Sequence, residues 1–229
     1  MGCLREGDRA LNWPFDDLLP FSFQLIEADP CWSFDNFSEA GEEKNAKAQY
    51  DCMPTEEIAS YPVGHLASKN CWLWLWATHP MLPDALEVMK VWGFKYVTSG
   101  VWSKRSADTE KKKGKLAFGT GYVLRCASEP FLIGKIGNPP TFSKSIRTVI
   151  EAPRRQHSRK PDNAYDVAVE LFGDVERVSL FSRVSRPGWK TWGKEKTLFD
   201  AGDPVSLKRD RPVSEERELE PMPLFHNVA

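Results

Sequence analysis

The segment Phe21-Ser-Phe-Gln-Leu-Ile-Glu-Ala-Asp-Pro-Cys-Trp32 is the most informative stretch of this 229-residue chain. Its first eight residues are mostly apolar and predict a buried strand over 22–28. An acid, a proline and an aromatic residue follow the strand at once, as Asp29, Pro30 and Trp32. Together these three residues can hold a flat nucleobase by its exocyclic amine. The segment therefore predicts a functional site at the carboxyl end of this strand.

The chemistry of these groups suits methyl transfer to an adenine amine. The N6 amine is a weak nucleophile because its lone pair is delocalised into the ring. Hydrogen bonds from its two N–H groups to a carboxylate and a carbonyl restore electron density on nitrogen as it attacks a methyl group. Asp29 would supply the carboxylate and Pro30 the carbonyl, which the fixed φ of proline aims. Trp32 would offer a face for stacking, although the pattern also fits a strand-ending turn with Trp32 in the core.

The rest of the chain alternates short apolar runs with amphipathic stretches, which is typical of a parallel sheet covered by helices. Further strands are expected near 71–77, 95–101, 130–136, 147–151 and 176–182. Helices are expected over 82–92 and 161–172, each ending at a glycine, with a third short helix beginning at Thr55. Loops are expected over 33–50, 105–115 and 137–145. In the second strand, alternate tryptophans at 72, 74 and 76 should pack on one face of the sheet.

Length and composition limit the alternatives. The chain is long enough for one α/β domain, expected over 1–200, followed by a charged, disordered tail over 201–229. The formal net charge is -1, so any contact with nucleic acid must come from a local basic surface. Five scattered cysteines (Cys3, Cys31, Cys52, Cys71 and Cys126) suggest neither a disulfide framework nor a metal site. The longest apolar run, 71–77, is too short to span a bilayer, so we expect a soluble, cytoplasmic protein.

Residues 21–195 resemble the MT-A70 family of adenine-N6 methyltransferases, which normally carry Asp-Pro-Pro-Trp. The early landmarks occur in the family's order as Ala28-Asp-Pro-Cys-Trp32, Pro54-Thr-Glu-Glu-Ile58, Leu73-Trp-Leu-Trp-Ala77, Trp92-Gly-Phe94 and Val101-Trp-Ser-Lys104. The later landmarks are Gly119-Thr-Gly121, Glu129 through Gly137-Asn-Pro139, His157-Ser-Arg-Lys-Pro-Asp162, Leu180-Phe-Ser-Arg183, Pro187-Gly-Trp189 and Trp192-Gly193. Ordered matches over most of the chain are far more specific than one tetrapeptide.

The resemblance implies a Rossmann-like, S-adenosylmethionine-dependent methyltransferase fold in which the catalytic motif precedes the cofactor-binding region. It implies a catalytic set of Asp29, Pro30, Cys31 and Trp32. It also implies that Asp29 lies near the amine of the methyl donor and that Lys104 pairs with its carboxylate. The remaining implied contacts are to the donor's ribose and methionine, from Arg183, Ser185, Arg186, Lys194 and Glu195.

The chain departs from the family pattern at two places. Cys31 replaces the second proline of the catalytic motif, which loosens the loop but leaves the Pro30 carbonyl available. Lys194-Glu195 replaces the usual Asn-Gln or Asn-Glu pair after Trp-Gly. A lysine can donate a hydrogen bond where asparagine donated one, but it cannot accept one.

Two basic clusters are candidates for contact with a phosphate backbone, namely Lys111, Lys112 and Lys113, and Arg154, Arg155, Arg159 and Lys160. The lysine run also fits a solvated loop. We expect methyl transfer to the N6 amine of adenine in DNA, on a base flipped out of the duplex, as in a restriction-modification enzyme. The alternatives are an RNA adenine-N6 methyltransferase and a non-catalytic nucleic-acid-binding subunit of the same fold. A homodimer or heterodimer is also compatible with the sequence.

Overall fold

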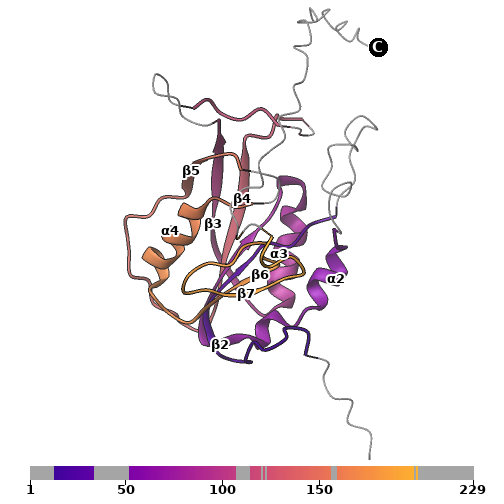
Figure 1. Ribbon diagram of the computed structural model, residues 1–229, viewed down its shortest axis with the longest axis vertical. Helices are drawn as coiled ribbons and strands as arrows, with labels where there is room; N and C mark the ends of the chain where they lie inside the picture. The colour runs from indigo at the N-terminus through magenta and orange to yellow at the C-terminus, as the bar shows by residue number, and fades with distance from the viewer. Residues whose placement is uncertain are drawn as a thin grey trace, which may run out of the picture.

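The computed structural model describes residues 13–33, 52–106, 114–119, 121, 123–155, 159–198 and 200. One mixed sheet with the strand order β5-β3-β4-β2-β1-β6-β7 runs through this part of the chain (Figure 1). Its strands are β1 (Phe23–Ala28), β2 (Ala67–Trp76), β3 (Lys95–Arg105), β4 (Ser128–Ile136), β5 (Val149–Pro153), β6 (Arg177–Leu180) and β7 (Lys190–Trp192). The helices are α2 (Thr55–Ser60), α3 (Leu82–Val91) and α4 (Asp162–Phe172), with 3-10 turns η2 (Val63–His65) and η3 (His79–Met81).

The predicted elements are confirmed, with changes at their ends. Every predicted strand and helix has a counterpart, but β2 begins at Ala67 and β3 continues to Arg105, further than the apolar runs indicated. The three-residue strand β7 was not predicted, because it is too short to carry a period-two pattern. Both long helices end at the predicted glycines, Gly93 and Gly173, which have φ values of 84° and 93°. An L-residue with a side chain rarely adopts that conformation.

The sheet is not all parallel, which corrects the expectation from the sequence. Strand β4 runs antiparallel to both of its neighbours, β2 and β3. The other pairs, β1 with β2 and β6, β3 with β5, and β6 with β7, are parallel. The first residues of β4 therefore lie beside the last residues of β3, as shown by the pairs Trp102 with Glu129 and Ser103 with Ser128. An apolar run does not encode strand direction, so the sequence could not predict this reversal.

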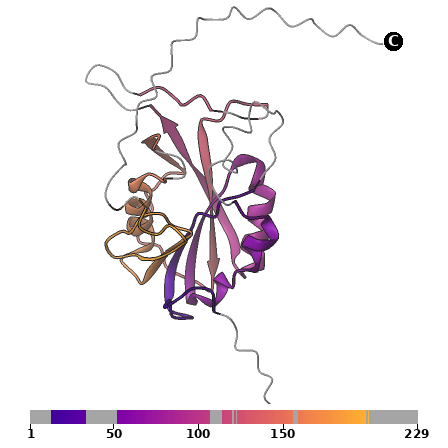
Figure 2. The ribbon, with the colours of Figure 1, turned by 45° about the vertical axis from the view of Figure 1, so that its right-hand side comes forward.

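Helices cover both faces of the sheet, with α2 and α3 on one side and α4 on the other (Figures 1 and 2). The first face packs α2 and α3 against apolar residues that include Ile26, Leu73 and Leu75. The second face packs α4 against Trp72, Trp74 and Trp76, so the predicted alternation of tryptophan rings is confirmed. Burying one large apolar side chain contributes about 1.5–3 kcal/mol. These two clusters hold the strand ends that carry the site in fixed positions.

Candidate active site

Asp29 follows β1 at the edge of the sheet where the parallel strands end. Its backbone N–H donates to the carbonyl of Leu180, the last residue of β6, over 3.2 Å. The side chain keeps 18% of its surface exposed, and its Oδ1 lies 2.6 Å from Nζ of Lys160. The acid is thus fixed by neighbours from two other parts of the chain while one side stays accessible.

Lys160 belongs to a chain of charges, a row of four side chains of alternating sign made of Asp29, Lys160, Glu129 and Lys104. Its side chain is only 5% exposed, and Nζ contacts Glu129 Oε1 at 2.8 Å as well as Asp29. The other oxygen of Glu129 contacts Nζ of Lys104 at 2.6 Å. Indole rings support both cations, since Lys160 lies over Trp76 at 5.4 Å and Lys104 over Trp102 at 4.9 Å.

Burial shifts the ionisation of this chain of charges. It raises the pKa of Asp29 above its usual range, and the charge of Lys160 offsets this only in part. Burial also opposes the charge on Glu129, but Lys160 and Lys104 outweigh it and lower the pKa of that carboxyl to about 2. Burial opposes the charge on Lys160 too, but Asp29 and Glu129 outweigh it and raise its pKa. Of the two carboxylates that contact Lys160, Asp29 is consequently the more basic.

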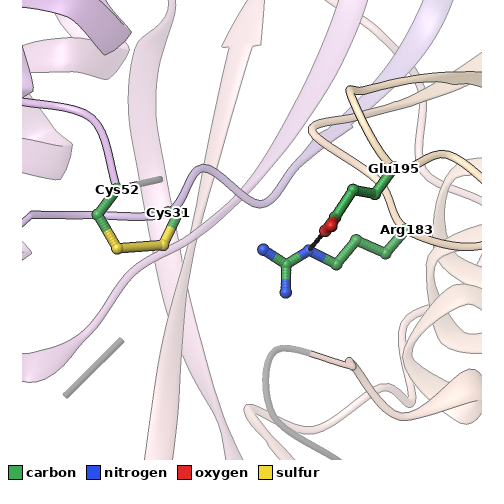
Figure 3. Close-up of a disulfide and its surroundings, with 4 residues drawn as sticks. All are labelled: Cys31, Cys52, Arg183 and Glu195. Carbon is green, nitrogen blue, oxygen red and sulfur yellow. Dashed lines mark ion pairs between the residues drawn. A yellow bond between two sulfur atoms is a disulfide. The ribbon is translucent and has the colours of Figure 1, made fainter. Parts of the chain in front are cut away.

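Two arginine side chains from the segment after β6 line the same pocket as Asp29. The pocket at this point is lined by Asp29, Lys160, Tyr165, Phe181, Arg183 and Arg186, among others, and has a volume of about 20 Å³. Arg183 Nε pairs with Glu195 Oε2 at 3.2 Å, as drawn in Figure 3. The guanidinium of Arg186 lies 3.6 Å from the centre of the Tyr165 ring.

Trp32 does not offer a stacking face, contrary to the prediction. Its side chain is 4% exposed and belongs to the core cluster under α2 and α3. Its indole N–H donates to the carbonyl of Trp76 over 3.0 Å. Trp32 therefore anchors the Asp29 loop to the end of β2, which is the structural alternative that the sequence left open.

The predicted phosphate contacts divide into three groups. Lys160 is buried in the site rather than on the surface, because its charge is needed between two carboxylates. Arg154 and Arg155 are exposed and Arg159 is half-buried, so these three remain candidates. Lys111, Lys112 and Lys113 lie outside the described residues.

The predicted cofactor-binding residues fall into two groups. Asp29, Lys104, Arg183 and Arg186 belong to the charged surroundings described above, and Glu195 reaches them through Arg183. Ser185 is exposed, and its backbone N–H donates to Asp200 Oδ1 over 2.7 Å. Lys194 is exposed as well. The structure thus brings most of the predicted set together, whereas Ser185 before β7 and Lys194 after it are exposed.

Cys31 and Cys52 form a disulfide, which corrects the expectation that the cysteines are unpaired (Figure 3). Their Cα atoms are 4.7 Å apart and their sequence separation is 21. Within the described residues Cys71 and Cys126 are free. The spacing carried no signal for this pair, because only the return of the chain beside Trp32 brings Cys52 to Cys31.

Two site residues were missed by the sequence reasoning. Glu129 precedes a predicted strand, so in an all-parallel sheet it would lie at the opposite edge; the reversal of β4 brings it to Lys160. Glu27 is buried inside β1, where its Oε2 accepts a hydrogen bond from Ser179 Oγ over 2.5 Å. A charged residue within an otherwise apolar strand was the available signal for Glu27.

Within the described residues, no group of three or more potential ligands from His, Cys, Asp and Glu comes together to hold a metal ion. In the same part of the chain no helix is long and apolar enough to cross a membrane.

The comparisons with known proteins agree with one another on the family. The family model described as MT-A70 matches residues 23–195. The chain is 26% identical over 204 residues to type II methyltransferase M.MunI from Mycoplasma sp., covering 80% of this chain and 83% of that protein. It is 27% identical over 191 residues to the human N(6)-adenosine-methyltransferase catalytic subunit METTL3, covering 82% of this chain and 30% of that protein. A probable N(6)-adenosine-methyltransferase MT-A70-like protein from Oryza sativa subsp. japonica is 27% identical, covering 87% of this chain and 27% of that protein. The chain thus spans under a third of these two longer relatives.

Proposed function

This chain belongs to the MT-A70 family, and we propose that it transfers a methyl group from S-adenosylmethionine to the N6 amine of adenine in DNA. MT-A70 methyltransferases use S-adenosylmethionine as the methyl donor, and the fold is the mixed α/β sheet expected of them.

One observation carries the proposal, namely the position of Asp29 in the chain of charges. The carboxylate is held by Lys160 at the end of β1 and remains partly exposed, and its pKa is raised by burial. A preorganised acceptor of this kind suits an amine whose N–H groups must be polarised as it attacks. The described residues of the pocket include no Ser-His or Cys-His pair that would instead support covalent catalysis.

The residues around the pocket fit the polar groups of the methyl donor. Arg186 Nη1 is buried and has no hydrogen-bond partner in the described part of the chain, so it can bind a carboxylate. Asp29 can accept from the donor's ammonium, and Glu195, held by Arg183, can accept from a ribose hydroxyl. Lys104 is already paired with Glu129, so in this proposal it acts on the donor carboxylate as part of that pair.

Asp29 and Pro30 would act directly on the base. When bound, S-adenosylmethionine supplies an electrophilic methyl group. The Asp29 carboxylate accepts a hydrogen bond from one N6 proton, and the carbonyl of the buried Pro30 accepts one from the other. The raised pKa of Asp29 also lets its carboxylate accept the proton that N6 loses as the new bond forms. Lys160 and Glu129 keep Asp29 in place throughout.

The choice of DNA follows the extent of the match. The alignment covers 83% of the relative named as a type II methyltransferase, but 30% of the one named as an adenosine methyltransferase catalytic subunit. The identities to the two, 26% and 27%, do not discriminate. RNA is therefore the second candidate substrate, since that subunit's name refers to adenosine.

A methylation assay with isotopically labelled S-adenosylmethionine tests the proposal. Mixed-sequence duplex DNA and transcribed RNA are incubated separately, digested to nucleosides and analysed by mass spectrometry. We expect label in N6-methyldeoxyadenosine, and a loss of rate on the order of 10²-fold or more in Asp29→Ala and Asp29→Asn. Both variants should keep a cooperative melting transition, because Lys160 retains its contact with Glu129.

Each other outcome has a defined meaning. Label only in RNA would select the second substrate. A folded wild-type protein that binds the donor but labels neither nucleic acid would indicate a non-catalytic subunit. Wild-type turnover by a folded Asp29→Ala protein would refute the role of Asp29.

A further inference from the structure

A second, larger cleft opens beside the pocket at Asp29. It lies between the end of β5 and the start of α4, and its lining includes Glu151, Arg154, Arg155, Arg159 and Asp162. Its volume is about 600 Å³, against about 20 Å³ for the pocket at Asp29. Arg159 lines both cavities, so the cleft adjoins the place where the target base is proposed to bind.

Asp162 gathers three guanidinium groups at this cleft. Its Oδ2 lies 2.7 Å from Nη1 of Arg155 and 3.9 Å from Nη2 of Arg159. Its Oδ1 lies 3.3 Å from Nη2 of Arg186, which lines the pocket at Asp29. One carboxylate thus holds arginines from both cavities, although these arginines come from different segments of the chain.

The cleft and its surroundings carry an excess of positive charge. Glu151 is engaged by Arg105, whose Nη2 lies 2.6 Å from Oε1. Asp162 is shared by Arg155, Arg159 and Arg186, and Arg154 adds an exposed guanidinium to the lining. In this described part of the chain, five guanidinium groups meet two carboxylates. Gathering cations in this way is unfavourable unless an anion binds among them.

The geometry favours a phosphodiester as that anion. Planar guanidinium groups present paired N–H donors whose geometry matches phosphate oxygens. An exposed cationic cleft next to a base-binding site is where the backbone flanking a flipped base must pass. Six of the nine residues that line the cleft have charged or amide side chains, which is not typical of an apolar small-molecule pocket.

We propose that this cleft binds the phosphodiester group next to the target adenine, with Arg155 and Arg159 as its contacts and Asp162 as a positioning residue. This inference rests on the proposed function and names the surface that holds the nucleic acid. Asp162 fixes Arg155 and Arg159 before binding, so less side-chain freedom is lost when the phosphate arrives. Because Asp162 also holds Arg186, the same carboxylate supports the methyl-donor pocket.

The first test measures the salt dependence of DNA binding by the full-length protein. A fluorescent adenine-containing duplex is titrated with wild type, Arg155→Gln and Arg147→Gln at several salt concentrations. Arg147 is the matched control, because it is exposed just before β5, at the other end of that strand from the cleft. Loss of one phosphate contact should reduce the slope of log K against log salt by about 0.9. We expect this change and weaker binding for Arg155→Gln, no change for Arg147→Gln, and unchanged S-adenosylmethionine affinity for both.

The second test separates the positioning role of Asp162 from a role in helix stability. Asp162→Asn should weaken both DNA and S-adenosylmethionine binding several-fold, whereas Asp162→Glu should recover much of both. Asp166→Asn, an exposed acid one turn along α4, is the control and should bind both ligands as wild type does. A structural role alone would lower the melting temperature of Asp162→Asn without changing either affinity.

The outcomes distinguish this inference from the proposed function. An unchanged salt slope for Arg155→Gln in a protein that methylates DNA overturns the cleft and leaves the function standing. Salt-dependent binding that needs Arg155, in a protein that methylates nothing, supports the cleft and refutes the function. A wild-type protein that binds neither the duplex nor an RNA of the same sequence overturns both.

Discussion

Glu27 lies in β1 and Asp29 directly follows that strand, yet the two carboxyl groups have different surroundings. Asp29 has a cation in contact, whereas Glu27 has the hydroxyl of Ser179 for one oxygen and no hydrogen-bond partner for Oε1 among the described residues. Burial, and then the charge of Asp29, raise the pKa of Glu27 to about 7. The carboxyl group of Glu27 thus changes its charge near neutral pH.

This difference predicts a pH-dependent effect of Glu27→Gln on stability. The folded protein holds a proton on Glu27 up to about pH 7, while the unfolded chain releases it near the ordinary value of 4.5. Stability from this group is therefore fully present below about pH 4.5, is lost as the pH rises from 4.5 to about 7, and changes little above that. The full shift of the Glu27 pKa, from 4.5 to about 7, corresponds to roughly 3 kcal/mol in the free energy of unfolding.

Urea unfolding at pH 5, 6, 7 and 8 measures the prediction. Relative to wild type, Glu27→Gln should become more stable from pH 5 to pH 7, and the difference should level off towards pH 8. Asp166→Asn, a carboxylate change at an exposed position, is the control and should show no such trend. A constant difference between wild type and Glu27→Gln at all four pH values would mean that Glu27 titrates normally.

At the scale of elements, the connection after β1 is fastened to the segment before α2. Met53 N–H donates to the carbonyl of Cys31 over 2.9 Å, and Ser33 N–H donates to that of Met53 over 3.1 Å. The Cys31–Cys52 disulfide joins the same two segments. Closing a loop with a sequence separation of 21 stabilises a fold by roughly 3 kcal/mol in the chain-entropy account. The fastening lies next to Pro30, whose carbonyl is proposed to receive the base.

Cys31→Pro restores the family motif and removes this disulfide, so its effects on activity and stability should separate. With a phosphine reductant present, the variant should transfer methyl groups at least as fast as wild type, because proline restricts a loop already in the required conformation. Reduction should lower the melting temperature of wild type but not that of the variant. Cys126→Ser is the control, since Cys126 is free and the change leaves the bridge intact.

The result that would contradict this view concerns the thiol itself. If Cys31→Pro and Cys31→Ser both lost all activity while remaining folded, the sulfur of Cys31 would have a part in methyl transfer. Equal effects of reduction on wild type and Cys31→Pro would show that the bridge does not contribute to stability.

At the scale of the whole molecule, residues before position 200 form the apolar clusters on both faces of the sheet. Trp192 of β7 makes edge contacts with Phe15, Tyr61 and Phe181, with ring centres 5.1–5.4 Å apart. Residues near the start and near the end of the described chain are thereby packed in one cluster. We propose that residues 1–200 form one methyltransferase domain.

Two truncations test this domain boundary. Deleting 201–229 should leave the melting temperature and the affinity for S-adenosylmethionine unchanged, because the sheet and both apolar clusters are retained. Deleting 190–229 should lower both, since it also removes β7, the Trp192 contacts and Glu195. Scanning calorimetry and isothermal titration measure the two quantities. A loss of stability on deleting 201–229 alone would place the boundary further along the chain.

The sequence by itself determined the features that depend on neighbouring residues. Apolar periodicity located the strands and helices, Gly93 and Gly173 marked the helix ends, and Asp29 was identified because it directly follows a strand. These signals are local, since each is set by the φ and ψ preferences and the spacing of a few adjacent residues. Family resemblance added Lys104, Arg183 and Arg186, which the fold brings to the same edge.

Only the tertiary structure decided which distant residues meet. The reversal of β4 puts Glu129 at the site, and the return of the chain after β5 puts Lys160 between two carboxylates rather than on a phosphate-binding surface. Contacts between distant segments also bury Trp32 in the core and join Cys31 to Cys52. Strand direction, ion pairs and burial depend on contacts between segments far apart in the chain, and such contacts leave no pattern in the residues on either side of them.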